Sequence, residues 1–503
     1  MREKRIKEKE VYFGGYYSPL SDPDIQKIHN ASMDVFESIG VKIAYAPVLE
    51  LWRKAGAEID KQTMIARMDR STVMKCLETA PHEIVLCGRD PKYDIRLSGT
   101  QTHLGTGGTA LNIIDPYTNE RRPTTIHDVA SAARVVDACE NIDFFVIACF
   151  PTELDKSIVD VNRFYAAIQN TSKHVMGGVY TKDGVRKIAR IAELIAGSKE
   201  AFKSRPFLSM ITSVMSPLLF DESYTELMET ACNMGFPLAT STAPMAGTTA
   251  PVTIAGTLVQ MNVEALSGII TTQLMDPGHP TLYSVVPTCT DLRTGTFCFG
   301  SVEMGMMNAA AAQIARYYRL PIYNTAGPTE SKILDSQSAY ESTFSVVLTA
   351  LAGANYIHEA AGILESGLTI SLNNYVINNE IIGMVKRVLK GIEVSEEKLA
   401  LDCIRRVGPG GTYISDEHTT RFMRQEAFYP DLADRKPRIV WETEGAVSAE
   451  ERANRVAVHY LENHQPQTVN SETDHAIRSE LPEILALTGT PIRRPYYTVG
   501  DFK

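Results

Sequence analysis

The feature that most constrains the fold is an alternation that begins near residue 141, where short apolar runs alternate with longer amphipathic runs. This alternation is typical of βα units, in which helices join parallel strands. A further strand is expected between Thr102 and Ile114. Eight strands at fairly regular spacing fit a closed parallel sheet better than an open one, so we predict an α/β fold of the (β/α)8 barrel type. The other seven predicted strands are 143–150, 174–180, 207–213, 237–242, 281–286, 321–326 and 355–359.

Helix signals stand between these runs. Thr125 with Asp128 three residues later, and Asp221 before an apolar-periodic run, predict helix starts, whereas Gly197 and Gly235 predict helix ends. The apolar stretch 251–275 contains polar residues such as Glu264, which would be costly in a bilayer. It therefore predicts a buried helix and no membrane span.

Three regions are predicted along the 503 residues. Residues 1–100 form an N-terminal cap region of helices and short strands, and residues 101–372 form the barrel core. Residues 373–503 form C-terminal helices and an extension that packs on the barrel or on a neighbouring subunit. The long extension favours a homo-oligomer.

Charge and cysteine content exclude several classes of function. The formal charge of −10 argues against a nucleic-acid partner, which requires clustered Lys and Arg. The first ten residues mix both charges with no apolar run behind them, so no signal peptide and a cytoplasmic location are expected. The eight cysteines form no CxxC pairs and have no suitably spaced histidines, which predicts free thiols and no zinc site.

The active site of a barrel forms where the strands end, so the residues closing each apolar run are the candidates. His358 and Glu359 close the last run, and because strand neighbours alternate faces, only one of them is expected to point into the barrel. Lys332 follows the seventh strand and is a candidate for a Schiff base or for anion binding.

A glycine-rich run, HLGTGGTALNIIDP, begins at His103. It lacks the GxGxxG register and the lysine of a phosphate-binding loop. Gly105, Gly107 and Gly108 are therefore predicted to let the backbone approach a flat cofactor or a partner closely, with a tight turn at the barrel mouth as the alternative.

Three long stretches resemble the trimethylamine methyltransferase family of corrinoid-dependent enzymes. They are GTGGTALNIIDPYTNERRPTT from Gly105, APMAGTTAPVTIAGTLVQMNVEALSG from Ala243 and GPGGTYISDEHTTRFMRQEAFYPDLADRKP from Gly408. The resemblance implies a (β/α)8 barrel that moves a methyl group from an amine to the Co(I) centre of a separate, cognate corrinoid protein. It also favours a homo-oligomer.

The resemblance has one departure. Family members that act on trimethylamine carry pyrrolysine near the end of the seventh strand, whereas the corresponding stretch here, YNTAGPTESKILDSQSAYES from Tyr323, contains only standard residues. Without pyrrolysine, a quaternary amine is the expected substrate, because its leaving group is already a neutral tertiary amine. Glycine betaine, proline betaine, carnitine and γ-butyrobetaine are all compatible with this expectation.

A quaternary ammonium is held by aromatic faces and a nearby carboxylate. Aromatic residues near the strand ends are Phe150, Tyr180, Tyr283, Tyr323, Tyr340 and Tyr356, and the acids are Glu330, Asp335, Glu341 and Glu359. Ordinary packing is the alternative role of each aromatic ring. A betaine carboxylate needs donors, for which the candidates are His358, Lys332, Arg293 and Asn324.

Two other functions remain open. A barrel lyase or aldolase would use Lys332 as its Schiff-base amine. A non-catalytic betaine-binding protein would bind the same ligand without turnover.

Overall fold

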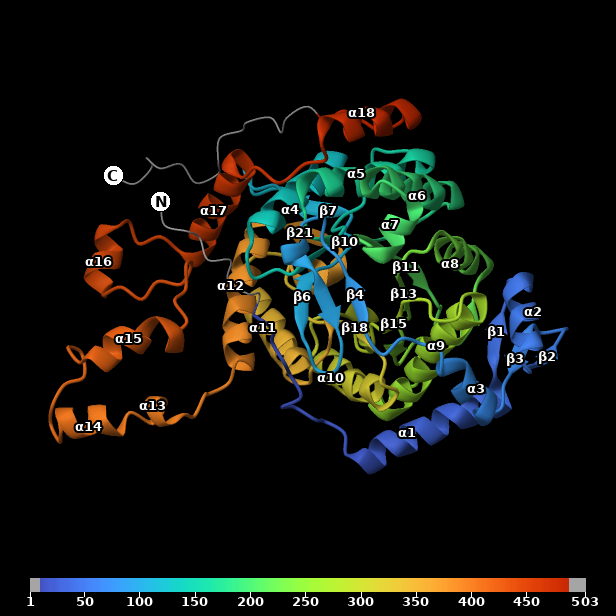
Figure 1. Ribbon diagram of the computed structural model, residues 1–503, viewed down its shortest axis with the longest axis horizontal. Helices are drawn as coiled ribbons and strands as arrows, with labels where there is room; N and C mark the ends of the chain where they lie inside the picture. The colour runs from blue at the N-terminus through green and yellow to red at the C-terminus, as the bar shows by residue number, and fades with distance from the viewer. Residues whose placement is uncertain (1–9, 488–503) are drawn as a thin grey trace.

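Eight parallel strands form the centre of the molecule, in a computed structural model that describes residues 10–487 (Figure 1). Their order is β6-β19-β18-β15-β13-β11-β10-β9, so that sequence neighbours are also neighbours in the sheet. The strands are β6 (His103–Thr106), β9 (Phe144–Val146), β10 (His174–Gly178), β11 (Leu208–Ser213), β13 (Leu238–Ser241), β15 (Thr281–Ser284), β18 (Ile322–Thr325) and β19 (Tyr356–Ala361). All eight predicted strands are confirmed.

The first and second strands close the barrel through a mixture of backbone and side-chain contacts. Asp143 N donates to Leu104 O at 2.8 Å, and Thr106 Oγ1 donates to Val146 O at 2.8 Å. Val146 N donates back to Thr106 Oγ1 at 2.8 Å. The Thr106 hydroxyl thus replaces part of the backbone hydrogen bonding between β6 and β9. The predicted (β/α)8 barrel is confirmed.

Eight main helices surround the strands. Thr125 and Asp128 form a capping box, Asp221 caps its helix, and Gly197 and Gly235 end theirs with φ values of 91° and 85°. Those four sequence signals are confirmed. The helices are α4 (Ile126–Ala138), α5 (Lys156–Asn170), α6 (Lys182–Ala196), α8 (Glu222–Met234), α9 (Ile254–Met275), α10 (Val302–Tyr317), α11 (Ser336–Leu351) and α12 (Leu372–Leu389), with a short α7 (Lys199–Ser204) after α6.

Helix α9 is the buried helix predicted from its apolar stretch. Glu264 in this helix is fully buried. Within the described residues, none of the helices has the length and apolarity that crossing a bilayer requires. The mixed-charge start of the chain, on which the expected location rests, lies largely outside the described residues.

The N-terminal region packs on the side and the bottom of the barrel. Helices α1 (Asp22–Asp34), α2 (Ala46–Lys54) and α3 (Arg70–Leu77) contact α9. Strands β1 (Val41–Ile43), β2 (Glu58–Asp60) and β3 (Ile65–Arg67) form a sheet with β12 (Leu219–Phe220). A π-helical turn at 35–39 follows α1.

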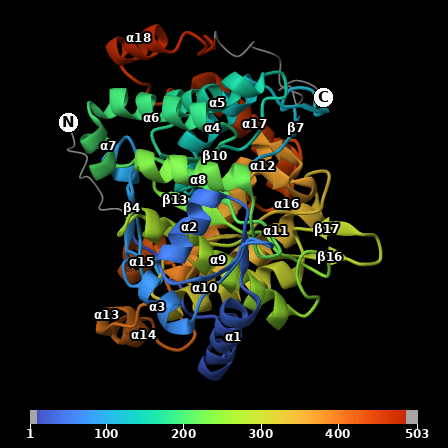
Figure 2. The same cartoon turned by 90° about the vertical axis from the view of Figure 1, so that its right-hand side faces the viewer.

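A separate hairpin closes the barrel at the amino ends of its strands. It consists of β4 (Ile84–Leu86) and β5 (Ile95–Leu97), whose apolar side chains share a core cluster with the barrel residues Phe144, Met176 and Tyr356. β16 (Thr288–Asp291) and β17 (Thr296–Cys298) form a hairpin beyond the carboxyl ends. In Figure 2, β4 lies on the left of the barrel and β16 and β17 on the right.

Further short strands extend the loops on the carboxyl side of the barrel. β14 (Met245–Ala246) pairs with β16. A four-stranded sheet in the order β20-β21-β7-β8 joins the loops after the first and the last barrel strands. Its strands are β7 (Asn112–Ile114), β8 (Arg121–Pro123), β20 (Ile363–Leu364) and β21 (Thr369–Ser371).

The C-terminal region differs in one respect from its predicted boundary. α12 contacts β19, α11 and α4, so it is the eighth barrel helix and the barrel continues to Leu389 beyond residue 372. The segment with α13 (Glu396–Leu399), α14 (Leu401–Val407), α15 (Glu417–Glu426) and α16 (Arg438–Thr443) then runs away from the barrel (Figure 1). α17 (Ala449–Asn463) returns to α12 and α4, and α18 (Ser471–Glu480) packs on α6.

Candidate functional site

A cavity of about 460 Å³ lies at the mouth of the barrel, where the strands end. One carboxyl group, Glu359, and no lysine or arginine belong to its lining. The lining residues are Gly108, Thr109, Gly178, Ile211, Ser213, Val214, Met215, Ser216, Tyr224, Ser241, Ala243, Met245, Thr249, Val286, Tyr323, His358 and Glu359.

His358 and Glu359 both line this pocket, so the expectation that only one of them faces inward is wrong. Glu359 has a φ of 63°, and the pairing of β19 with β6 shifts register between Ile357 and Ala361. A left-handed residue in a bulge interrupts the alternation of side chains that a regular strand imposes. The irregular strand end thus presents two consecutive side chains to the same cavity.

Glu359 is deeply buried, with 4% of its surface exposed. Thr325 Oγ1 donates a hydrogen bond to Glu359 Oε2 at 2.5 Å. Burial raises the pKa of Glu359 to about 8, and this single hydrogen bond offsets only part of that effect. The carboxyl group is therefore mostly protonated near neutral pH while no cation is beside it.

His358 lies next to this carboxyl group, with 3.9 Å between its Nδ1 and Glu359 Oε1. Burial lowers the pKa of His358 to about 3, so the ring is neutral at physiological pH. Neither ring nitrogen has a hydrogen-bond partner among the described residues. A neutral imidazole with free nitrogens can donate one hydrogen bond to a ligand and accept another.

Aromatic rings are stacked along the barrel interior below and beside Glu359. The ring centroids of Phe144 and Tyr356 are 3.6 Å apart, and those of Tyr356 and Tyr323 are 5.6 Å apart. Tyr323 in turn stacks on His358 at 4.2 Å. Tyr323 lines the pocket, whereas Tyr356 lies one layer deeper and supports it.

The three predicted glycines make room for atoms of the barrel itself. A Cβ atom on Gly107 would lie 1.9 Å from Glu359 Cγ, and one on Gly105 would lie 2.2 Å from the Phe144 ring. Gly108 lines the pocket, and a Cβ there would meet Ile147 O at 2.1 Å. Close packing of the barrel is enough to require glycine at these three positions. Binding of a cofactor or a partner by these glycines stays a prediction.

Several other predicted residues are directed away from the pocket. Tyr283 donates to Asn262 Oδ1 in α9 at 3.0 Å, and Asn324 donates to Asn308 O in α10 at 3.0 Å. Both side chains therefore lie between strands and helices, because they alternate with the inward-facing residues of β15 and β18. Tyr340 is 62% exposed on α11.

The remaining charged candidates have partners outside the pocket lining. Lys332 is exposed and its Nζ donates to Glu330 O at 2.7 Å, and Arg293 forms an ion pair with Asp291 at 2.6 Å. Asp335 caps α11. Glu330 accepts from the backbone of the loop before α10, and Glu341 in turn accepts from Glu330 N at 2.9 Å.

Arg163 on α5 is a functional candidate that the sequence analysis missed. Its guanidinium carbon lies 5.8 Å from the centroid of Phe150 and 5.3 Å from that of Tyr180. These two rings meet edge to face at 5.3 Å. Arg163 Nη1 also donates to the carbonyl of Gly178, a pocket-lining residue, at 3.5 Å. The available signal was a charged residue directly before the apolar run FYAAI.

Glu264 is a second missed residue, and it connects two loops of the pocket rim. Its carboxylate accepts hydrogen bonds from Ser216 Oγ at 2.8 Å, from Leu218 N at 2.9 Å, and from Thr242 Oγ1. Gln260 Nε2 bonds both Glu264 Oε1 and the carbonyl of Thr249. The polar residues that interrupt the apolar stretch of α9 therefore hold the loops after β11 and β13.

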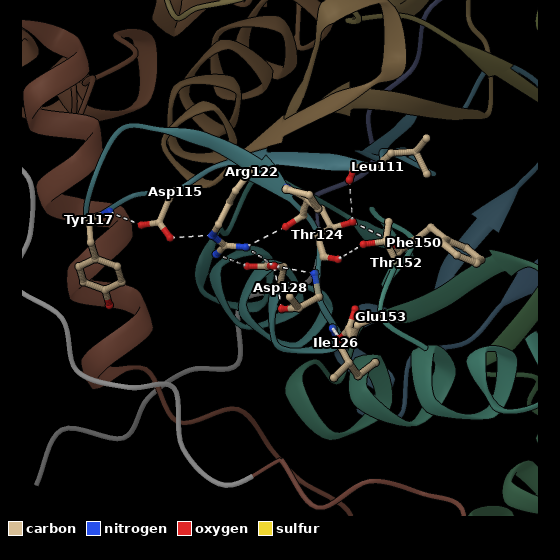
Figure 3. A network of polar contacts seen from close by, with 12 residues as sticks. Leu111, Asp115, Tyr117, Arg122, Thr124, Ile126, Asp128, Phe150, Thr152 and Glu153 are labelled. Atoms are coloured by element: carbon tan, nitrogen blue, oxygen red, sulfur yellow. Dashed lines mark hydrogen bonds and ion pairs between the residues drawn. The ribbon is translucent and has the colours of Figure 1, made fainter. Parts of the chain in front are cut away.

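A polar network fixes the loops after the first two strands (Figure 3). Arg122 forms ion pairs with Asp115 at 2.9 Å and with Asp128 at 2.7 Å. Thr124 Oγ1 donates to the carbonyl of Phe150, whose own N–H donates to Ala110 O. The backbone of Phe150 is thus held by a network that includes the start of α4.

The comparisons with known proteins identify the family of the chain. The family model described as "Trimethylamine methyltransferase (MTTB)" matches residues 5–482. The chain belongs to the trimethylamine methyltransferase family. The resemblance proposed from the three sequence stretches is confirmed, and the methyltransferase class follows from it.

Individual relatives carry two different substrate names. The chain is 36% identical over 92% of its length to trimethylamine methyltransferase MttB of Desulfitobacterium hafniense, and covers 93% of that protein. It is 29% identical over 92% of its length to the glycine betaine methyltransferase of another strain of that species, and covers 96% of it. A solved structure of the Methanosarcina barkeri monomethylamine methyltransferase aligns with 90% of the chain and 96% of its own, with a TM-score of 0.46 and 14% identity.

In the part of the chain that the structure describes, no group of three or more His, Cys, Asp or Glu side chains is placed to hold a metal ion. The cysteines are free thiols.

Proposed function

We propose that this protein transfers a methyl group from a quaternary amine of the betaine type to the Co(I) centre of a corrinoid carried by a separate protein. The observation that carries the proposal is the pocket lining, in which one carboxyl group and aromatic faces stand without any lysine or arginine. A quaternary ammonium has no N–H to donate, so ring faces and a carboxylate are the contacts that suit it.

Glu359 is proposed to change its protonation state during the cycle. A cation beside this buried carboxyl group favours the ionised form, so substrate binding would release a proton from Glu359. When the methyl group leaves, the nitrogen becomes neutral and the buried carboxylate loses its partner. A proton from solvent then returns to the site, and Glu359 is protonated again once the amine has left.

The pocket contributes placement and desolvation to the transfer. The stacked rings of Tyr323 and His358 form one wall, and Met215 and Met245 stand on the rim loops. Displacement on a quaternary ammonium disperses charge, so a pocket that excludes water favours the transition state over the solvated cation. No general acid is needed, because the leaving amine is neutral.

The mouth suits an acceptor delivered by another protein. Exposed large apolar side chains lie on the loops and at one helix start that follow six of the eight barrel strands, on the face where the pocket opens. Such a surface is typical of protein–protein contact. When bound there, the corrinoid would supply the Co(I) nucleophile. The side chains are Leu111, Met215, Val252, Leu292, Val302, Ile333 and Leu368.

The test is methylation of cobalamin. Purified protein is mixed with Co(I) cobalamin or with the cognate corrinoid protein and with one amine at a time, and methyl-Co(III) is followed by absorbance. We expect methylation by at least one betaine and none by trimethylamine. Glu359→Gln should lower the rate, whereas Asp291→Asn, on the β16–β17 hairpin outside the pocket lining, should not. Absence of methylation with every quaternary amine and with the corrinoid protein present would contradict the proposal.

A further inference from the structure

Arg163 occupies a position that its contacts within the protein do not satisfy. Its side chain is completely buried, and neither Nε nor Nη2 has a hydrogen-bond partner among the described residues. The one hydrogen bond of the guanidinium, from Nη1 to Gly178 O, is long at 3.5 Å. A guanidinium carries five N–H donors and no acceptor, so burying it with most of them unpaired is costly.

The nearest acidic side chain on the same helix does not supply the missing acceptor. Asp160 accepts from Tyr180 N at 3.1 Å, from Thr181 N at 2.9 Å and from Thr181 Oγ1 at 3.0 Å. Over residues 10–487, no carboxylate oxygen lies within ion-pairing distance, 4.0 Å, of the Arg163 nitrogens. The faces of Phe150 and Tyr180 offset part of the cost of burying the charge, but they leave two N–H groups without acceptors.

We propose that Arg163 is the counter-ion of a substrate carboxylate and thereby determines specificity for zwitterionic amines. The two unsatisfied nitrogens, Nε and Nη2, share one edge of the guanidinium, the edge that binds both oxygens of a carboxylate side by side. This inference rests on the proposed function and adds a residue that recognises the negative end of the substrate.

Gly178 connects Arg163 with the pocket. It ends β10, lines the cavity, and its carbonyl contacts the Arg163 guanidinium. A Cβ atom on Gly178 would meet nothing within 4 Å, and its φ is not in the left-handed region. Neither packing nor backbone geometry requires glycine there, so the missing side chain leaves free space on the wall beside Arg163.

The charges are arranged as a zwitterion requires. In the strand order, β10 lies four strands from β18, on the opposite side of the barrel from Tyr323. The carboxyl group of Glu359 and the rings of Tyr323 and His358 therefore suit the ammonium end, and Arg163 behind Gly178 suits the carboxylate end. The rings of Phe150 and Tyr180 are half-buried and cover the guanidinium from solvent.

The test compares two ligands that differ in the carboxylate. Glycine betaine and choline both carry a trimethylammonium group, but choline has a hydroxyl group in place of the carboxylate. Binding is measured by calorimetry without any corrinoid, for the wild type, Arg163→Gln, Arg163→Lys and Gly178→Ala. Arg316→Gln is the matched control, because Arg316 is partly buried on α10 and donates to a backbone carbonyl.

We expect Arg163→Gln to weaken binding of glycine betaine by roughly 100-fold, because truncating one member of a buried charged pair has effects of this size. Choline binding should change less than about twofold, and Arg163→Lys should recover part of the loss because it keeps a point charge. Gly178→Ala, which the backbone accommodates, should weaken betaine binding selectively and serves as the second variant if Arg163→Gln does not fold.

Four results would overturn the inference. The first three are equal losses for betaine and choline in folded Arg163→Gln, unchanged betaine binding in that variant, and no binding of glycine betaine, carnitine or γ-butyrobetaine by the wild type. Arg163-dependent binding of acetate with no such dependence for a betaine would likewise overturn it, in favour of a site for free anions. If Arg163-dependent betaine binding appears without methyl transfer to any acceptor, the proposed function fails while this inference stands.

Discussion

The protonation of Glu359 predicts how substrate affinity depends on pH. With a pKa of about 8, about 10% of the free protein carries an ionised Glu359 at pH 7, and about 1% does so at pH 6. If the quaternary cation binds the ionised form, the dissociation constant falls about tenfold per pH unit up to pH 8 and then levels off. His358 does not add to this dependence, because its pKa of about 3 keeps the ring neutral throughout.

Calorimetry measures this effect directly. Titration of the protein with the betaine substrate in two buffers of different ionisation enthalpy counts the protons released on binding. At pH 7 we expect about 0.9 proton per site, since that fraction of Glu359 must ionise. Glu359→Gln should bind more weakly, release no proton and show no pH dependence between 6 and 9. Asp291→Asn is the control, because hydrogen bonds from Arg293 hold the pKa of Asp291 at about 2, so it stays ionised over this range.

A wild type that releases no proton at pH 7 would refute this role of Glu359. A fall in affinity as the pH rises from 6 to 8 would refute it equally, because it would mean that the cation prefers a protonated Glu359.

Three further predictions follow from the same site. Because the pKa of Glu359 is raised, the folded state keeps a proton that the unfolded state loses above about pH 4.5, so the free energy of unfolding falls as the pH rises towards 8. Glu359→Gln should therefore unfold at a higher denaturant concentration than the wild type at pH 9, but not at pH 5. Tyr323→Phe should retain substrate affinity, whereas Tyr323→Leu should lose about 0.5–2 kcal/mol of binding free energy, as measured by calorimetry. Equal losses in the two variants would exclude a role for the ring face. Gly107→Ala would place a Cβ atom 1.9 Å from Glu359 Cγ and displace that side chain. We expect the variant to fold, as checked by circular dichroism, but to lose most of its methyl transfer. Turnover at the wild-type rate would show that the Gly107 position does not need to lack a side chain.

The barrel was predictable because its signals are local. Strand runs, the capping box at Thr125 and the glycine ends at Gly197 and Gly235 depend on residues close together in sequence, and each of them is confirmed. The boundary at residue 372 fell short because α12 is the eighth barrel helix, and its contact with α4 closes a ring between distant parts of the chain. A pattern of residues close together in sequence does not indicate a contact between helices as far apart in the chain as α4 and α12.

The candidate site was predictable only in part, for a physical reason. Tyr323, His358 and Glu359 were chosen for their position at strand ends and line the candidate pocket, but strict alternation failed at Glu359, whose left-handed backbone breaks the period of two. Conversely, alternation itself explains why Tyr283 and Asn324 face the helices. Arg163 could not be predicted from strand ends, because it reaches the barrel mouth from α5 and its place beside Phe150 and Tyr180 depends on how this helix packs.

The β4–β5 hairpin at the bottom of the barrel has a consequence for how ligands enter and leave the pocket. Within the described residues, β4 and β5 occupy one end, so the chamber opens on the face where the acceptor protein is proposed to dock. If the acceptor docks on that face, the amine would have to bind before the acceptor protein, and the demethylated amine would leave only after the acceptor protein has dissociated. The β4–β5 hairpin would thereby set the order in which the two proposed reactants bind, although it contacts neither of them.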